Sequence, residues 1–183
     1  RPDDEPEATA YSCLHVKSSK GWRVDRMSEQ PVIIPRSNYQ RLKGLEWMIG
    51  TWIDQDDAAT VTTTSQWTKN QNFIVRRFSV SVEGESDLSG VQMVGWDPVA
   101  SGIRSWVFDS DGGFGSSTWK QKGTKWIINS QATLSDGRKA SSVKTIDVID
   151  NDTVTWEMTG RSIDGEILPS IAPIQLTRTA VSE

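Results

Sequence analysis

The stretch LEWMIGTWIDQDD, residues 45–57, marks the point at which this chain changes from a helical to a strand pattern. Up to this point, apolar residues recur at helical spacing, at Tyr39, Leu42, Leu45 and Met48. Beyond it, apolar and polar residues alternate, which is the pattern of a half-buried strand. We therefore expect a short helix that ends within this stretch and leads directly into the first of many strands.

From residue 51 to residue 178, turn signals recur roughly every ten residues, and no helical run lies between them. Turns such as EGESD, DPVASG and DSDGGFG separate segments that are rich in Val, Thr, Ile and Trp. A long series of antiparallel strands closes on itself or folds over, because an open sheet would expose its edges. The prediction is an all-β fold, an antiparallel meander barrel of about ten strands with a short N-terminal plug helix.

The first 36 residues differ from the rest of the chain. Residues 1–8 carry two prolines and four acidic residues, which is typical of a loose end. The runs ATAYSCLHVK and WRVDRMSEQ flank the turn cluster SSKG and predict a hairpin, and QPVIIPRSN reads as an extended linker. The expected organisation is a tail, hairpin and linker at 1–36, followed by the barrel domain at 37–183.

Composition excludes several classes of function. The chain has 183 residues, a net charge of −4 and 36% hydrophobic residues, which indicates a folded domain without the basic face of a nucleic-acid binder. It has no apolar run of the ~20 residues that a membrane-spanning helix needs. Cys13 is the only cysteine, so no internal disulfide reports on the compartment. The chain begins without methionine, as a trimmed product would, and the compartment therefore stays undecided between cytoplasm and export after removal of a leader.

Two motifs carry a resemblance to lipocalins. Gly50-Thr51-Trp52 on the first strand and Arg178 in the closing LTR resemble the lipocalin signature, in which the tryptophan closes one end of the barrel and the arginine lies across its indole. Over residues 42–178 the chain is similar to a lipocalin-like (calycin) family of uncharacterised bacterial proteins. That similarity rests on LEWMIGTW, VGWDPVASGIRSWVFDSDGGFG and DGEILPSIAPIQLTR. The resemblance implies a calycin-like barrel in a bacterial protein, and it does not imply a particular activity.

A second resemblance concerns the N-terminal hairpin. ATAYSCLHVKSSKGWRVDRMSEQ is similar to the closing hairpin of a SnoaL-like domain, the curved-sheet fold of polyketide cyclases and nuclear transport factor two. The rest of such a domain is missing, which implies that the chain is the C-terminal part of a longer protein. The hairpin would then pair with the barrel, self-associate with a second copy of the chain, or stay frayed, because two-stranded hairpins are marginally stable alone.

The sequence contains no catalytic constellation and no cofactor or metal motif. His15 is the only histidine, and it shares a strand face with Tyr11, Cys13 and Lys17, where a half-exposed strand residue is the expected role. A haem barrel would need a histidine in its wall, and residues 51–178 have none. Whether the full protein is an enzyme stays open.

Arginines within apolar strands give the sharpest functional signal. In FIVRRFSV, either Arg76 or Arg77 faces the barrel interior if this segment is part of the wall. A buried arginine needs an acidic partner or an anionic ligand. Asp109 is a candidate partner for these arginines and for Arg104. The alternative is a structural ion pair, or a bulge that turns both adjacent arginines toward water.

Tryptophan and glycine supply the remaining candidates. Nine tryptophans are many for this length, and they serve either as core filler or as stacking surfaces for a ligand. Four of them fall near strand ends or in mid-wall and are candidates for lining a cavity: Trp67, Trp96, Trp106 and Trp119. The stretch FDSDGGFG, residues 108–115, is expected to be a hairpin turn that could act as a mobile lip, although its alternating aspartates faintly resemble a calcium loop.

The leading hypothesis is non-enzymatic binding of a small, largely apolar molecule, with a negative charge as an option, inside the barrel. The predicted binding residues are Trp67, Arg76, Arg77, Arg104, Trp106, Asp109 and Trp119. Two alternatives stay open. One is an accessory barrel of a SnoaL-like enzyme that acts on a polycyclic substrate, and the other is a filled barrel with an interaction or assembly role. Neither a nucleic acid nor a membrane is an expected partner.

Overall fold

The computed structural model describes residues 9–31, 37–55, 59–82 and 85–179. The chain divides into two compact units, Arg1–Arg36 and Ser37–Glu183. The predicted loose end at 1–8 and most of the predicted linker lie outside the described residues.

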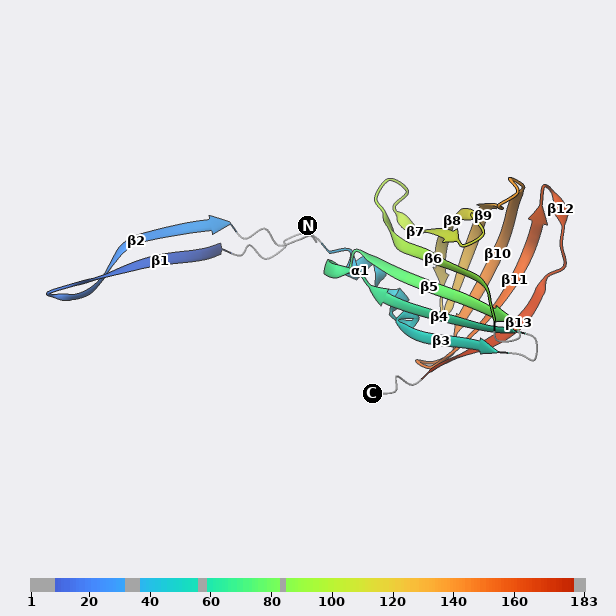
Figure 1. Cartoon of the computed structure of the whole chain (residues 1–183), viewed down its shortest axis with the longest axis horizontal. Coiled ribbons are helices and arrows are strands. Elements are labelled where there is room, and N and C mark those ends of the chain that lie inside the picture. Colours follow the sequence, from blue (N-terminus) through green and yellow to red (C-terminus); the bar gives the residue numbers. More distant parts are fainter. Residues whose placement is uncertain (1–8, 32–36, 56–58, 83–84, 180–183) are drawn as a thin grey trace. The chain divides into compact units, whose positions relative to one another are not determined.

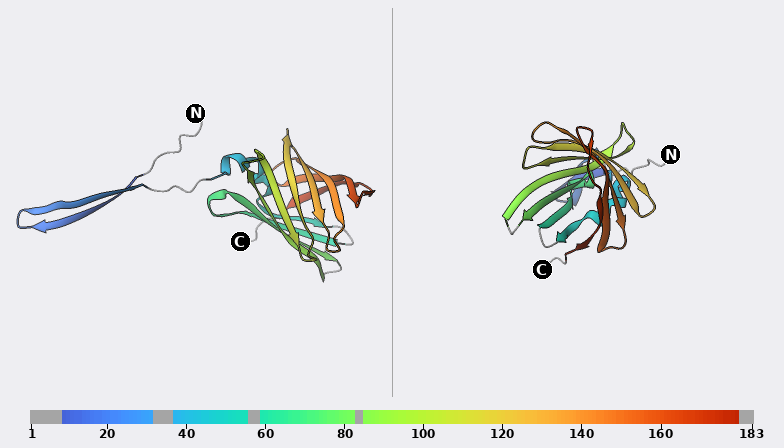
Figure 2. Two further views of the ribbon diagram at one scale, coloured as in Figure 1. Left: turned by 90° about the horizontal axis from the view of Figure 1, so that it is seen from above. Right: turned by 90° about the vertical axis from the view of Figure 1, so that its right-hand side faces the viewer.

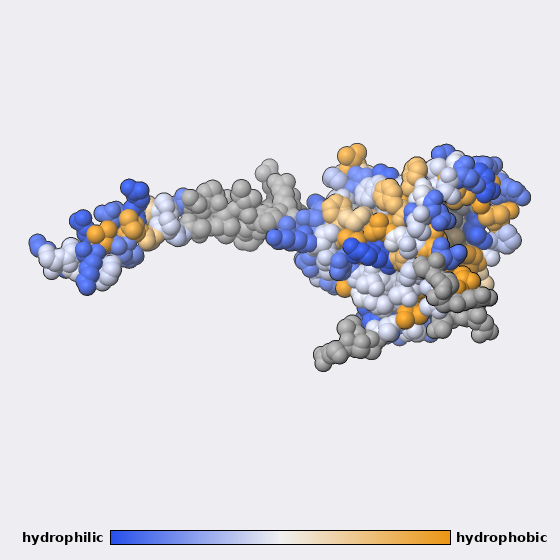
Figure 3. Space-filling view, in the orientation of Figure 1, coloured by the Kyte–Doolittle hydropathy of each residue, from blue (hydrophilic) through white to orange (hydrophobic). Residues whose placement is uncertain are grey.

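The first unit is a β-hairpin. Strands β1 (Thr9–Ser18) and β2 (Gly21–Pro31) pair antiparallel, with one register shift after Leu14, and in the described part of the chain they pair only with each other. Both Cys13 and His15 are exposed. Large apolar side chains on this unit are exposed as well: Tyr11, Leu14, Trp22, Val24 and Met27. Hydrophobic residues, coloured orange, are visible on its surface in Figure 3. Self-association through the hairpin stays a prediction.

The second unit is a closed, ten-stranded antiparallel barrel with one short helix, which confirms the predicted fold (Figures 1 and 2). Each strand from β3 to β11 pairs with the next along the chain, and β13 closes the ring between β11 and β3. The barrel strands are β3 (Gly50–Gln55), β4 (Ala59–Trp67), β5 (Phe73–Val82), β6 (Glu85–Asp97), β7 (Gly102–Asp109), β8 (Phe114–Lys122), β9 (Lys125–Thr133), β10 (Lys139–Val148), β11 (Thr153–Ile163) and β13 (Ile171–Arg178). The two-residue strand β12 (Glu166–Ile167) pairs with β11.

A helical segment plugs one end of the barrel. The helix α1 (Tyr39–Leu42) is a single turn and continues as the 3-10 helix η1 (Lys43–Met48), whereas the spacing predicted one continuous helix. Gly44 explains the close approach of this segment, because a Cβ atom there would lie 3.2 Å from the ring of Trp126. A second 3-10 turn, η2 (Lys69–Gln71), connects β4 to β5.

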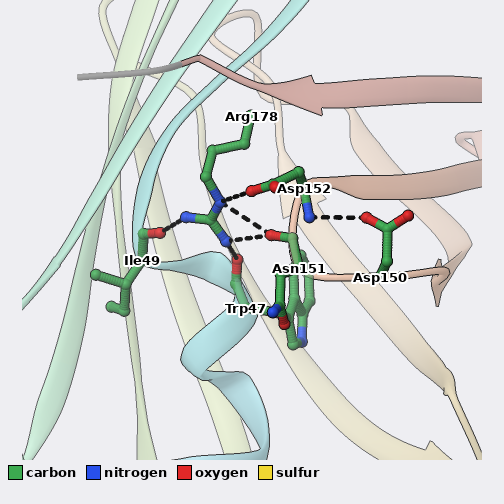
Figure 4. A network of polar contacts seen from close by, with 6 residues as sticks. All are labelled: Trp47, Ile49, Asp150, Asn151, Asp152 and Arg178. Carbon is green, nitrogen blue, oxygen red and sulfur yellow. Dashed lines mark hydrogen bonds and ion pairs between the residues drawn. The ribbon is translucent and has the colours of Figure 1, made fainter. Parts of the chain in front are cut away.

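Arg178 fastens the plug to the barrel wall (Figure 4). Its guanidinium lies over the Trp52 indole, with 4.6 Å between the guanidinium carbon and the ring centroid. It donates hydrogen bonds to the backbone carbonyls of Ile49, Trp47 and Asn151 and pairs with the Asp152 carboxylate at 3.2 Å. The structure confirms the expected contact between arginine and tryptophan and shows that it also satisfies the last carbonyls of the plug.

The hydrophobic core is concentrated at the plugged end. Leu42, Leu45 and Met48 of the plug are buried with Trp52 and Trp126. The rest of the core comes from strands of the wall: Ile74, Val94, Trp119, Ile128, Ile146 and Val154.

Farther along β8, β9 and β10, the inward positions are occupied by small residues. Ser117, Ser130 and Ser142 are paired across these three strands, and Gly115, Ala132 and Ala140 form the next such row. Side chains of this size cannot fill a ten-stranded barrel, so space remains inside.

Candidate functional site

The barrel interior contains two neighbouring regions of empty space that share lining residues. An inner chamber of about 40 Å³ lies against the plug and is lined by residues that include Trp47 and Trp52. An outer chamber of about 350 Å³ lies among residues that include Phe78 and Met158. Four residues line both chambers: Arg76, Trp119, Lys144 and Ile146. The outer chamber has the size of a small-molecule pocket, whereas the inner one matches a small polar group.

Arg76 reaches the interior from the middle of β5. Ile74, two residues earlier on the same strand, is fully buried. Because alternate residues of a strand share a face, Arg76 also points into the barrel. The guanidinium donates weak hydrogen bonds to Gln92 Oε1 at 3.3 Å and to Thr63 Oγ1 at 3.4 Å. Burial lowers the pKa of Arg76 to about 10. No carboxylate in the described ranges forms an ion pair with it.

Lys144 faces Arg76 from β10, on the other side of the chambers. Its Nζ atom lies 4.0 Å from the centroid of the Trp156 ring, within cation–π distance. Burial lowers the pKa of the Lys144 amine to about 7, and the positive charge of Arg76 adds to the decrease. The negative charge of Asp54 acts in the opposite direction and is the smallest of these three effects. Among the described residues, Lys144 also has no ion-pair partner.

Further hydrogen-bond donors belong to the inner chamber. The indole N–H groups of Trp47 and Trp52 and the hydroxyl of Ser65 are buried and have no hydrogen-bond partner within the described structure. All three residues line the inner chamber together with Arg76 and Lys144. An unpaired buried donor costs about 1–3 kcal/mol. The residues that line the inner chamber therefore carry two basic groups, together with three donors that have no partner within the described structure.

The structure brings only two of the predicted binding residues, Arg76 and Trp119, to these chambers. Trp119 is buried, and its indole N–H donates to Ser105 Oγ at 2.9 Å. Arg77 is exposed on the outer face, because it follows the inward-facing Arg76 on the same strand. Arg104 also lies on the outer face, where it pairs with Asp97 at 3.2 Å.

The other candidates have structural contacts elsewhere. Trp106 lies beneath the guanidinium of Arg104 on the outer face, with 5.7 Å from guanidinium carbon to ring centroid. Trp67 packs edge-on against Tyr39 beside the plug, at a centroid distance of 5.8 Å. Trp96 lies under Arg41, at 5.2 Å.

Asp109 is part of the turn that follows β7 and is not a partner of the arginines. Its carboxylate accepts hydrogen bonds from the backbone N–H groups of Gly113, at 2.8 Å, and Asp111, at 3.2 Å. The backbone of the same turn is closed by a hydrogen bond from Asp109 N–H to the Gly113 carbonyl at 3.0 Å. These contacts are those of a hairpin turn, as predicted for DSDGGFG.

Sequence reasoning missed Lys144, although a signal was present. In SSVKTIDVI, Lys144 has the same strand phase as Ile146 and Val148, so alternation alone places it on the inward face. Trp156 lines the inner chamber as well, and its ring lies within cation–π distance of Lys144.

Comparisons with known proteins assign no family. No protein-family model matches the chain, and no curated protein is significantly similar to it. No helix in the described ranges is long and apolar enough to cross a membrane. In the same ranges, no group of three or more His, Cys, Asp or Glu residues lies close enough together to hold a metal ion.

Replacing Lys144 with methionine is expected to stabilise the barrel by up to about 4 kcal/mol at pH 6 and to have little effect at pH 10. The Lys144 pKa is about 7 in the folded chain, and that of an unfolded lysine is near 10.4. Between these values the unfolded chain binds more protons, so the wild-type barrel gains stability as the pH rises. Below pH 7 the amine is protonated in both states, and the full burial penalty applies.

Urea unfolding at pH 6, 8 and 10, followed by tryptophan fluorescence, measures this difference. The control is Lys120→Met, an exposed lysine on β8, for which the difference from wild type should stay near zero at every pH. If the free energies of unfolding of Lys144→Met and wild type differed by the same amount at every pH, the assignment of a buried, titrating amine would be contradicted.

Proposed function

We propose that this barrel binds a small, largely apolar molecule that carries a carboxylate group. One observation carries the proposal: the side chains of Arg76 and Lys144 lie inside the barrel, line the same two chambers, and have no ion-pair partner among the described residues. Buried cations are costly unless they are paired. A bound carboxylate would supply the missing charge.

The two chambers match the two parts of such a ligand. A carboxylate in the inner chamber would accept hydrogen bonds from Arg76 and Lys144, which both line it. Charge-assisted hydrogen bonds of this kind are roughly twice as strong as neutral ones. The apolar part would extend into the outer chamber, whose wall includes Phe78 and Met158. Burial of the apolar part provides affinity, and the charged group sets the orientation.

As part of this proposal, we assign the chain to the lipocalin-like barrels. The closed meander and the packing of Arg178 on Trp52 at the plugged end support this assignment. Many proteins of different function share one fold, so the ligand class rests on the chambers and not on this likeness.

Octanoate is expected to bind with one site per barrel, and its affinity is expected to fall as the pH rises above 7. A carboxylate favours the protonated form of Lys144, whose pKa is about 7 in the empty barrel. Binding at higher pH must therefore take up a proton, which weakens it by up to about tenfold per pH unit. Isothermal titration at pH 6.5, 7.5 and 8.5, in buffers of different ionisation heat, measures both the affinity and the proton uptake.

Octanol and hexanoate are the matched ligands. Octanol keeps the chain length and lacks the charge, so it should bind more weakly and without proton uptake. Hexanoate keeps the charge and loses two methylenes, worth about 0.8 kcal/mol each when buried. Failure of octanoate to bind folded protein at millimolar concentration would refute the proposal and favour the filled barrel with an interaction or assembly role.

A further inference from the structure

Lys144 differs from every other lysine in the chain. All nine lysines lie in the described ranges, and eight of them are exposed: Lys17, Lys20, Lys43, Lys69, Lys120, Lys122, Lys125 and Lys139. Only Lys144 points into the barrel, where its amine faces the Trp156 ring and borders both chambers. It makes no ion pair within the described structure. A lysine held in this way is a candidate nucleophile.

We propose that Lys144 forms a Schiff base with the aldehyde group of an apolar ligand held in the barrel. The inference shares with the proposed function the condition that the chambers admit an apolar chain. It goes further in assigning a covalent step to a single amine.

The state of the amine allows this step near neutral pH. A lysine nucleophile must be unprotonated, and an ordinary lysine, with a pKa near 10.4, is almost fully protonated at pH 7.5. The Lys144 pKa is lowered to about 7 by burial, with a further contribution from the charge of Arg76. At pH 7.5 a large share of Lys144 is therefore the free amine, and it lies in a cavity that an apolar aldehyde would enter.

The step is balanced within the ligand and one side chain. The Lys144 nitrogen attacks the carbonyl carbon, a C–N bond forms, and the carbonyl oxygen takes a proton to give a carbinolamine. The C–O bond then breaks, and the oxygen leaves as water with the two hydrogens of the amine, which leaves a C=N bond. No oxidant or reductant is needed. Arg76 borders the same chambers and would stabilise the negative charge that develops on the oxygen.

Reductive trapping with octanal tests this inference. The full chain is mixed with octanal and sodium cyanoborohydride at pH 7.5, and the adduct is followed by intact mass and located by peptide mapping. Cyanoborohydride adds hydride to the C=N bond and makes the adduct stable. We expect one octyl group per chain, on Lys144, to form at least tenfold faster than an adduct on any other amine.

Three variants test whether the fast adduct forms on Lys144 itself. Lys144→Met should lose the fast adduct, and Lys120→Met should keep it. Lys144→Arg keeps a positive charge in the barrel and cannot form a Schiff base, so it should also lose the fast adduct. Circular dichroism confirms that each variant is folded, and unlabelled octanoate should slow trapping in the wild-type chain by competing for the same chambers.

The outcomes distinguish this inference from the proposed function. Octanoate binding together with octanal adducts that are spread over exposed lysines would overturn the Schiff-base inference and leave the proposed function standing. A fast adduct on Lys144 without octanoate binding would support the inference and overturn the carboxylate proposal. A fast adduct that persists in Lys144→Arg would overturn the assignment of Lys144.

Discussion

Replacing Arg178 with alanine is expected to lower the free energy of unfolding of the barrel by about 3–4 kcal/mol. The guanidinium packs on Trp52 and donates to the carbonyls of Ile49, Trp47 and Asn151. Loss of the cation–π contact costs about 0.5–2 kcal/mol, and the carbonyls at the plug lose their donor at a further cost. Because Arg178 lies on the strand that closes the ring against β3, its loss weakens both the plug and the closing seam.

Urea unfolding followed by fluorescence measures the effect, since eight of the nine tryptophans belong to the barrel unit. Arg178→Lys keeps the charge over the indole and loses the forked geometry, so about half of the loss is expected. Arg138→Ala removes an exposed arginine that pairs with Asp136 at 2.7 Å, and it should change stability by less than about 0.5 kcal/mol. A loss below 1 kcal/mol for Arg178→Ala would contradict a role in fastening the plug.

Replacing Arg76 with methionine is expected to act in opposite directions on binding and on stability. Octanoate affinity should fall at least about thirtyfold, because removing one partner of a buried charge pair costs about 2–5 kcal/mol. The empty barrel should become more stable by about 2 kcal/mol, because a methionine of similar length removes an interior charge that has no ion-pair partner within the described structure. Burial lowers the pKa of Arg76 to about 10, because the charged guanidinium is less favourable inside the barrel than in water.

Arg77→Met is the matched control for this experiment. Arg77 is the next residue on the same strand, and its side chain is exposed on the outer face. Neither octanoate affinity nor stability should change by more than about 0.5 kcal/mol. Titration calorimetry and urea unfolding on the same samples give both quantities. If Arg76→Met bound octanoate as wild type does, or if it were destabilised, the interior arginine would be part of a structural network and not an anion site.

Local pattern was sufficient for the architecture. Alternation and turn residues after Gly50 predicted an antiparallel meander of about ten strands, and the structure has ten barrel strands. These features are local, because strand periodicity and turn chemistry depend only on neighbouring residues. The helix was predicted less well, because apolar spacing alone does not distinguish an α-helix from the 3-10 helix that η1 forms, nor show that Gly44 lies against Trp126.

Which polar side chains point into the barrel and which point outward was harder to predict. Strand β7, with the sequence GIRSWVFD, has apolar residues on both faces, so alternation could not orient Arg104 and Trp106. The structure turns both outward and buries Ser105, because the Ser105 hydroxyl accepts the indole N–H of Trp119 from the neighbouring strand. A small residue is buried here because a large side chain from another strand occupies the space.

The amino-acid sequence alone was therefore enough for the strands, the turns and the alternation that places Arg76 and Arg77 on opposite faces. Tertiary structure decided which of the two enters the barrel, and it placed Lys144 and Arg76 around the same chambers although β5 and β10 are far apart in the chain. The physical reason is that periodicity is a property of one strand, whereas burial, cavity volume and the pairing of charges depend on how all ten strands close around a common interior.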